Sequence, residues 1–152
     1  KTEHGTIADS LAIAEFLAEQ FPEAALWPKD TAARAQARSA CAQMHAGFFA
    51  MRGNMPFDLS RDAPLSPTPD DVQVEIQRML ALWAECREAA TDTGPFLFGG
   101  ATLADAFFAP IAVRLRTYQV KLPAADEAYV ETIYQWPAFK AWQKAGLEEV
   151  GQ

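Results

Sequence analysis

The sequence is poor in the residues that bind metal ions. Its 152 residues include only two cysteines, Cys41 and Cys86, and two histidines, His4 and His45. The cysteines are isolated and have no CxxC spacing, so we expect no zinc site and no other metal. A disulfide between them stays open, but buried free thiols in a reducing cytosol are the simpler interpretation.

Positive charge and long apolar runs are also scarce. Lysine and arginine number 13 against 20 acidic residues, which gives a net charge of −7 and disfavours nonspecific binding to nucleic acid or anionic membranes. The longest apolar stretch contains Asp105 and is followed by Arg114, so no segment reaches the roughly 20 residues that span a bilayer. Half of the residues are hydrophobic, enough for the core of a compact domain. We therefore expect a cytoplasmic protein that binds neither nucleic acid nor membranes.

The clearest pattern is a helix predicted over residues 102–118. Apolar side chains recur there at helical spacing, at Leu103, Phe107, Ile111, Leu115 and Tyr118. Little of its circumference is polar, so we expect the most buried helix of a mostly helical domain. Thr102 and Asp105 have the spacing of a capping box, in which each side chain bonds to the other residue's backbone N–H.

Further helices are predicted on both sides of this one. One follows Asp9 or Ser10, either of which can be its N-cap, and ends before Pro22 with an apolar stripe at Ile13, Leu17 and Phe21. Others are expected over residues 30–52 and 70–90, with the Pro-rich break 53–69 between them. A helix beginning near residue 123 and a final helix from residue 137 complete the series. Residues 1–8 are typical of the tip and return strand of a hairpin.

The final helix carries three large apolar residues. These are Phe139, Trp142 and Leu147, and their spacing predicts that they face inward.

Several stretches together resemble the glutathione S-transferase family. They are DSLAIAEFLAEQFP followed by LWP, then GPFLFGGATLADAFFAPIAVRL, and WPAFKAWQ near the end. The resemblance covers nearly the whole chain and implies an all-α fold, a helical bundle like the C-terminal domain of that family, preceded by a remnant of a thioredoxin-like α/β domain. Residues 1–21 would be the end of the glutathione-binding domain, 22–29 the linker, and 30–152 the helical domain.

The resemblance also implies a ligand site. Asp9 and Ser10 match the acidic-Ser step where the family binds the γ-glutamyl end of glutathione, the co-substrate. A Ser hydroxyl at a helix N-terminus suits a carboxylate, and a nearby acid suits an ammonium. The alternative is that the two residues only cap the helix. Thr102 and Asp105 match the family's capping box and are structural in both interpretations.

The residue that activates the glutathione sulfur, a Tyr, Ser or Cys in this family, is expected upstream of Lys1. We therefore place no catalytic residue in this chain and expect the chain alone to be inactive. Its parent would be a transferase, commonly a homodimer, that conjugates or otherwise uses glutathione on a small hydrophobic electrophile. The alternative is a non-catalytic interaction or ligand-binding module with the same helical fold.

By the same analogy, an acceptor-substrate pocket would be lined by two helices of the bundle. The candidates are Met44, His45, Phe48, Arg52, Arg114 and Tyr118. Met44 and Phe48, four residues apart, are explained more simply by core packing. His45 is more often a surface histidine than a catalytic one. Arg52 can either complement the helix dipole or bind an anionic substrate group.

Overall fold

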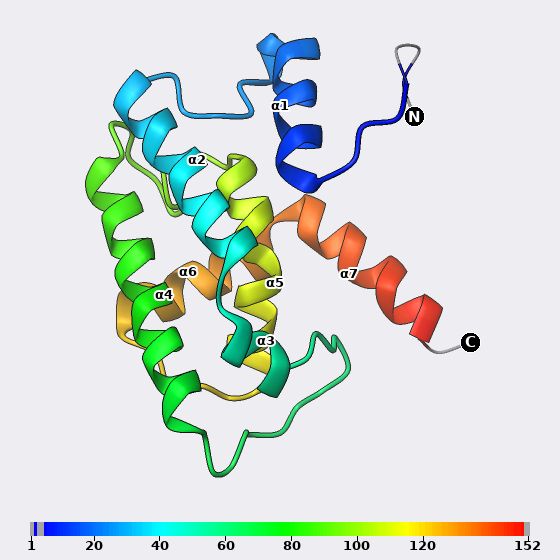
Figure 1. The fold of residues 1–152 in the computed structure, drawn as a ribbon, viewed down its shortest axis with the longest axis vertical. Coiled ribbons are helices and arrows are strands. Elements are labelled where there is room, and N and C mark those ends of the chain that lie inside the picture. Colours follow the sequence, from blue (N-terminus) through cyan, green and yellow to red (C-terminus); the bar gives the residue numbers. More distant parts are fainter. Residues whose placement is uncertain (1, 3–4, 151–152) are drawn as a thin grey trace.

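The structure is a computed structural model that describes residue 2 and residues 5–150. This part of the chain forms seven α-helices and one 3₁₀ helix, and the all-α fold is confirmed (Figure 1). The elements are α1 (Ser10–Gln20), η1 (Pro22–Ala24), α2 (Thr31–Ala46), α3 (Phe49–Asn54), α4 (Asp70–Ala89), α5 (Leu103–Thr117), α6 (Ala124–Gln135) and α7 (Pro137–Val150). None of these helices is both long enough and apolar enough to cross a bilayer.

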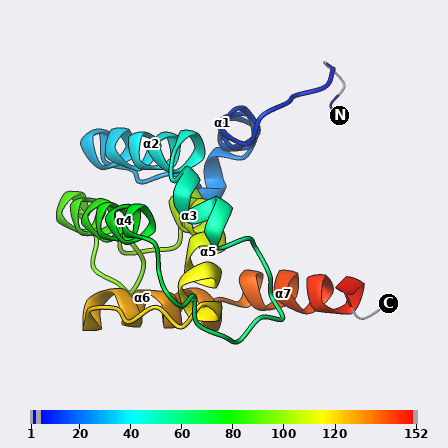
Figure 2. The same ribbon diagram turned by 60° about the horizontal axis from the view of Figure 1, so that its bottom comes forward.

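Helix α5 lies at the centre of the arrangement. It packs against α2 on one side and α6 on the other, while α4 packs against α2 and α3. Figure 2 shows α2, α4 and α6 stacked across the bundle, with α1 and α7 on the same side of it. The two outer helices therefore flank a face of the bundle that α2 and α4 do not cover.

The core is built around Trp83 of α4, which is completely buried. Its ring meets Phe108 of α5 edge to face at 6.1 Å and Tyr129 of α6 at 4.7 Å between centroids. Aromatic pairs in this geometry add to the stabilisation from apolar burial. The three helices are thus joined at one point by their largest side chains.

The predicted central helix is confirmed. Thr102 is the N-cap of α5 and Tyr118 its C-cap, and the capping box between Thr102 and Asp105 is formed. Asp105 Oδ2 accepts from the Thr102 N–H at 2.8 Å and from the Thr102 hydroxyl at 3.1 Å. The carboxylate thereby satisfies a backbone donor that no intrahelical bond could reach.

The prediction of one helix over residues 30–52 is wrong, because the segment forms α2 and α3. Gly47 is extended and Phe48 has a left-handed backbone (φ 62°, ψ 42°), which turns the chain between the two helices. Phe48 is 1% exposed, so the break places a large ring in the core. Tertiary burial has overridden the helix propensity of the alanine-rich segment.

Two predictions at the ends of the chain need correction. Thr2 and Gly5 form an antiparallel bridge, as in a hairpin tip, but the expected return strand is absent over residues 6–8. A strand needs a neighbour for its hydrogen bonds, and this segment has none in the described part of the chain; residues 1, 3 and 4 lie outside that part. In α7, Phe139 is buried as predicted, whereas Trp142 and Leu147 are exposed.

Candidate functional site

The start of α1 has an unusual backbone. Asp9 caps the helix, and its Oδ1 accepts from the Leu11 N–H at 2.8 Å. Its dihedral angles are φ 76° and ψ 133°, a combination that residues with a side chain rarely adopt. Asp30 performs the same capping role for α2 with φ −62° and ψ 137°. Capping alone therefore does not require the conformation of Asp9.

The end of α2 meets the start of α1 through one side chain. His45 Nε2 lies 2.8 Å from Asp9 Oδ2, and His45 Nδ1 lies 3.4 Å from the hydroxyl of Ser10. The bond from Leu11 is the main cause that lowers the pKa of Asp9, and His45 adds to it, so this exposed carboxyl is ionised at neutral pH. The structure thus brings together three of the predicted ligand residues, Asp9, Ser10 and His45.

The order Ser, His, Asp also occurs in hydrolases, and the geometry argues against that chemistry here. The Ser10–His45 distance of 3.4 Å is long for a hydroxyl that transfers its proton to the ring. The His45 and Asp9 side chains are 39% and 48% exposed. A catalytic relay needs a dry and fixed site, so we read this group as a polar binding site at a helix N-terminus.

Three of the acceptor-pocket candidates line a second site, a cleft of about 290 Å³ beside the bundle. Met44 comes from the last turn of α2, Arg52 from α3 and Arg114 from α5. The remaining lining residues are apolar and come from the loop after α3, from α5 and from α7: Phe57, Pro110, Ile111 and Trp142.

Both arginines are held by backbone carbonyls. Arg52 Nη2 donates to the Met44 oxygen at 2.6 Å, and Arg114 donates to the Met55 oxygen at 2.8 Å through Nε and to the Pro110 oxygen at 3.2 Å through Nη1. Arg52 also donates to the His45 oxygen at 3.4 Å. His45, which contacts Asp9 through its side chain, therefore also contacts Arg52 of the cleft through its backbone oxygen.

The other two candidates lie elsewhere. Phe48 is in the core, with the Arg78 guanidinium 4.8 Å above its ring. Tyr118 lines a separate cavity of about 520 Å³, and its hydroxyl donates to the Pro56 oxygen at 3.2 Å. Neither residue lines the cleft of Arg52 and Arg114.

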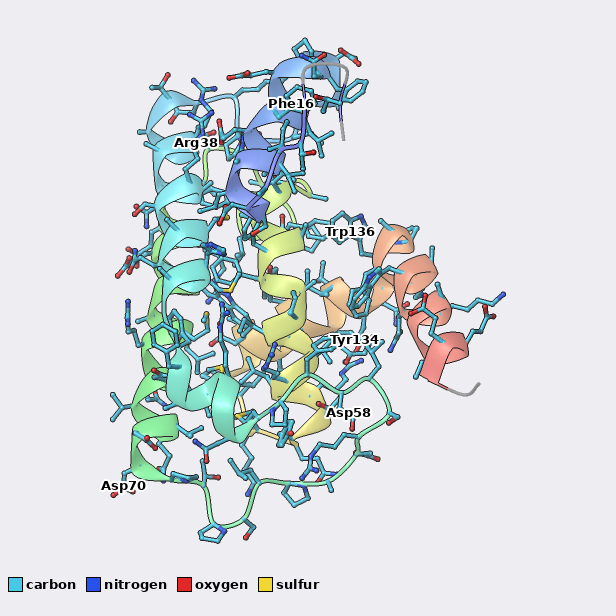
Figure 3. All side chains as sticks on the ribbon, turned by 45° about the vertical axis from the view of Figure 1, so that its right-hand side comes forward. Phe16, Arg38, Asp58, Asp70, Tyr134 and Trp136 are labelled. Carbon is cyan, nitrogen blue, oxygen red and sulfur yellow. The ribbon has the colours of Figure 1, made fainter. Side chains whose placement is uncertain are left out.

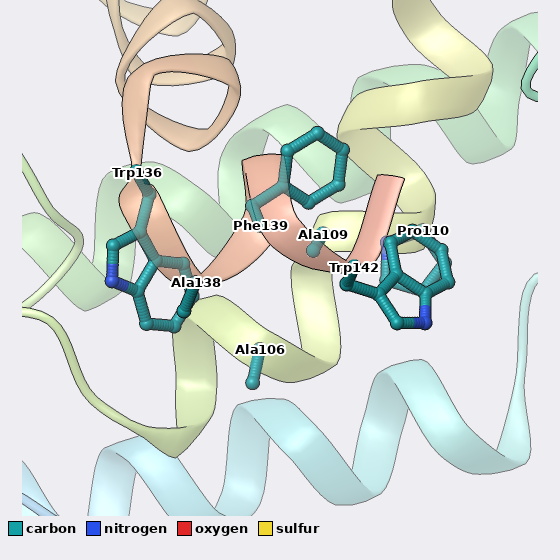
Figure 4. A pocket seen from close by; sticks show the side chains of 7 residues that line it. All are labelled: Ala106, Ala109, Pro110, Trp136, Ala138, Phe139 and Trp142. Carbon is teal, nitrogen blue, oxygen red and sulfur yellow. The ribbon is translucent and has the colours of Figure 1, made fainter. Parts of the chain in front are cut away.

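An apolar hollow of about 260 Å³ adjoins the cleft and shares Pro110 and Trp142 with it. Figure 4 shows the two tryptophans, Trp136 and Trp142, on either side of Phe139 along one wall. The opposite wall is α5, through Ala106, Ala109 and Pro110. In Figure 3 this region, marked by Trp136, lies where α7 leaves the bundle.

The two cysteines take no part in either site. Both are free and buried, as the sequence predicted, and burial is the main cause that raises the pKa of each thiol to about 12. A nucleophilic cysteine needs a thiolate at neutral pH. Neither Cys41 nor Cys86 provides one.

Sequence reasoning missed Phe57 and Trp142 as cleft residues. Phe57 lies in the Pro-rich loop, where no periodic pattern indicates its direction. The sequence pattern predicts that Trp142 faces inward, whereas it is 48% exposed and its ring lies 5.8 Å from that of Phe57, tilted by 54°. For Trp142, the available sequence signal was a large aromatic residue on the final predicted helix.

Comparison with known proteins gives no family for the chain. No protein-family model matches the sequence, and no curated protein matches it. A function must therefore be argued from the residues and their geometry.

Proposed function

We propose that this chain belongs to a glutathione S-transferase-like protein that uses glutathione on a small electrophile. In this proposal the start of α1 binds the γ-glutamyl end of glutathione, and the bundle supplies the neighbouring acceptor cleft. The proposal assigns the activation of the glutathione sulfur to no residue of this chain, so the experiments below measure binding in the full-length protein.

The observation that carries the proposal is the backbone of Asp9. A non-glycine residue with φ 76° and ψ 133° is strained, and strain of this kind gathers at binding and catalytic sites. Since Asp30 and Thr102 cap their helices without it, capping leaves the strain unexplained. A ligand-binding role for the turn before α1 explains it.

The chemistry of the site suits the proposed ligand. The γ-glutamyl end of glutathione carries one carboxylate and one ammonium group. The Ser10 hydroxyl and those N–H groups in the first turn of α1 that Asp9 does not cap can donate to the carboxylate. Asp9 Oδ2, which already contacts His45, has a second lone pair for the ammonium. Ser10 is the first residue of α1 and not its cap, so its hydroxyl, which lies 3.4 Å from His45 Nδ1, is not used in capping.

The Ser10→Ala variant tests this assignment. We expect the affinity of the full-length protein for glutathione, measured by calorimetry, to fall roughly tenfold because one hydrogen bond to a charged group is lost. The melting temperature should stay within a degree or two, since Asp9 remains the cap. Ser39→Ala, at an exposed position of α2, is the matched control and should change neither quantity.

Two results would count against the proposal. A full-length protein that shows no heat of glutathione binding would refute it. A loss of stability in Ser10→Ala with unchanged affinity would assign Ser10 to helix capping alone.

A further inference from the structure

The cleft beside α5 combines positive charge with an apolar lining. It holds two positive charges, Arg52 and Arg114, and none of its lining residues is acidic. Within the part of the chain that the structure describes, neither guanidinium has a carboxylate within ion-pair distance. This is unexpected in a chain with seven more negative than positive charges.

The two arginines are also set in an apolar surface. Phe57 and Trp142 meet in a tilted ring contact at one side of the cleft, and the Arg114 guanidinium lies 5.5 Å from the centre of the Phe57 ring. Burial is the main cause that lowers the pKa of Arg114, and the charge of Arg52 lowers it further. An anion in the cleft would oppose both effects, because a nearby negative charge favours the charged guanidinium.

Part of each guanidinium remains free to donate. Arg114 uses Nε and one hydrogen of Nη1 on backbone oxygens, and Arg52 uses Nη2 on the last carbonyls of α2. These bonds fix both side chains while leaving N–H groups for a ligand, since each guanidinium carries five N–H donors. Arginines held in this way are preorganised for a planar carboxylate.

We infer that the cleft binds a small apolar molecule that carries a carboxylate, with the carboxylate on Arg52 and Arg114 and the apolar body against Phe57 and Trp142. A volume of about 290 Å³ admits a single-ring compound with a short acidic side chain. As the acceptor site of the transferase the cleft depends on the proposed function, but the binding itself does not require glutathione.

The inference is tested with two probes of nearly the same shape, cinnamate and its uncharged amide, cinnamamide. Ligand-observed NMR titration of the full-length protein without glutathione should show cinnamate binding at least tenfold more tightly. Arg52→Gln should lower the affinity for cinnamate roughly tenfold and leave that for cinnamamide unchanged. Lys144→Gln, which removes a charge from an exposed position of α7, should leave both unchanged.

Equal affinity of the unmodified protein for the two probes, or no saturable binding of cinnamate, would overturn the inference. This comparison needs no variant, so it holds even if the Arg52→Gln protein folds poorly. An unchanged preference for cinnamate in folded Arg52→Gln would overturn it too. If cinnamate is preferred by a protein that does not bind glutathione, the cleft assignment stands and the transferase proposal fails.

Discussion

Asp105 connects three parts of the core through one buried carboxylate. Its Oδ2 accepts from the backbone and hydroxyl of Thr102, while Oδ1 accepts from the Leu97 N–H at 3.2 Å and the Tyr129 hydroxyl at 3.1 Å. Burial is the main cause that raises its pKa, and these hydrogen bonds act in the opposite direction. The side chain therefore fixes the start of α5, the loop before it and α6 at the same time.

Replacing Asp105 with alanine should destabilise the fold strongly. The change leaves buried donors on Leu97, Thr102 and Tyr129 without their acceptor, and a loss of about 3 kcal/mol or more in the free energy of unfolding is expected. Urea unfolding followed by circular dichroism measures it, with Glu88→Ala at an exposed position of α4 as the control. A loss no larger than that of Glu88→Ala would show that the network contributes little.

Regular helices were predicted well where pattern and end signals agreed. For α4 and α5, apolar periodicity, joined in α5 by the capping box at its start, places each element within a residue or two of its observed bounds. The break between α2 and α3 was missed, because alanine-rich sequence continues the helical pattern through it. Its cause is the burial of Phe48, a contact with distant parts of the chain that no local window contains.

Two glycines near this break should respond to alanine in opposite ways. A Cβ at Gly47 would lie 2.9 Å from the backbone oxygen of Gln43, a contact that α2 can relieve only by shifting. We expect Gly47→Ala to lower the free energy of unfolding by about 1–2 kcal/mol. Gly53 lies in α3 with open space around it, so Gly53→Ala should raise stability by roughly 0.5–1 kcal/mol through helix propensity.

Thermal or urea unfolding of the two variants side by side measures this difference. Equal stability of Gly47→Ala and Gly53→Ala would mean that the turn between α2 and α3 adapts without cost.

The two candidate sites differ in how far they could be predicted from the sequence. Asp9 and Ser10 were candidates through the family resemblance, which could be recognised because the two residues are adjacent in sequence at a helix start. The cleft joins Arg52 and Arg114 to Phe57 and Trp142, and these residues meet only because α5 passes α3 and α7 in space. The direction of a loop residue such as Phe57 depends on that path and not on its neighbours in sequence.

One face of the molecule is apolar and open. Ile13, Leu17 and Phe21 follow each other along α1 and are 42%, 37% and 50% exposed. Helix α1 is tied to the bundle through Glu15, which accepts from Arg38 Nε at 2.8 Å, and through Asp9, which contacts His45. A helical stripe of large apolar residues in water is unfavourable, which suggests that another part of the protein covers it. In the proposed transferase, this cover is the rest of the thioredoxin-like domain.

Leu17 allows that assignment to be tested. If the stripe packs against a thioredoxin-like domain, Leu17→Ala in the full-length protein removes a core side chain and should lower the free energy of unfolding by about 2–3 kcal/mol. If the face is open to water, the loss should stay within about 0.5 kcal/mol. Glu19→Ala, on the same helix and exposed, controls for the change in helix surface. Urea unfolding of both variants distinguishes the two cases. Equal losses in the free energy of unfolding would mean that no thioredoxin-like domain packs against the apolar face of α1.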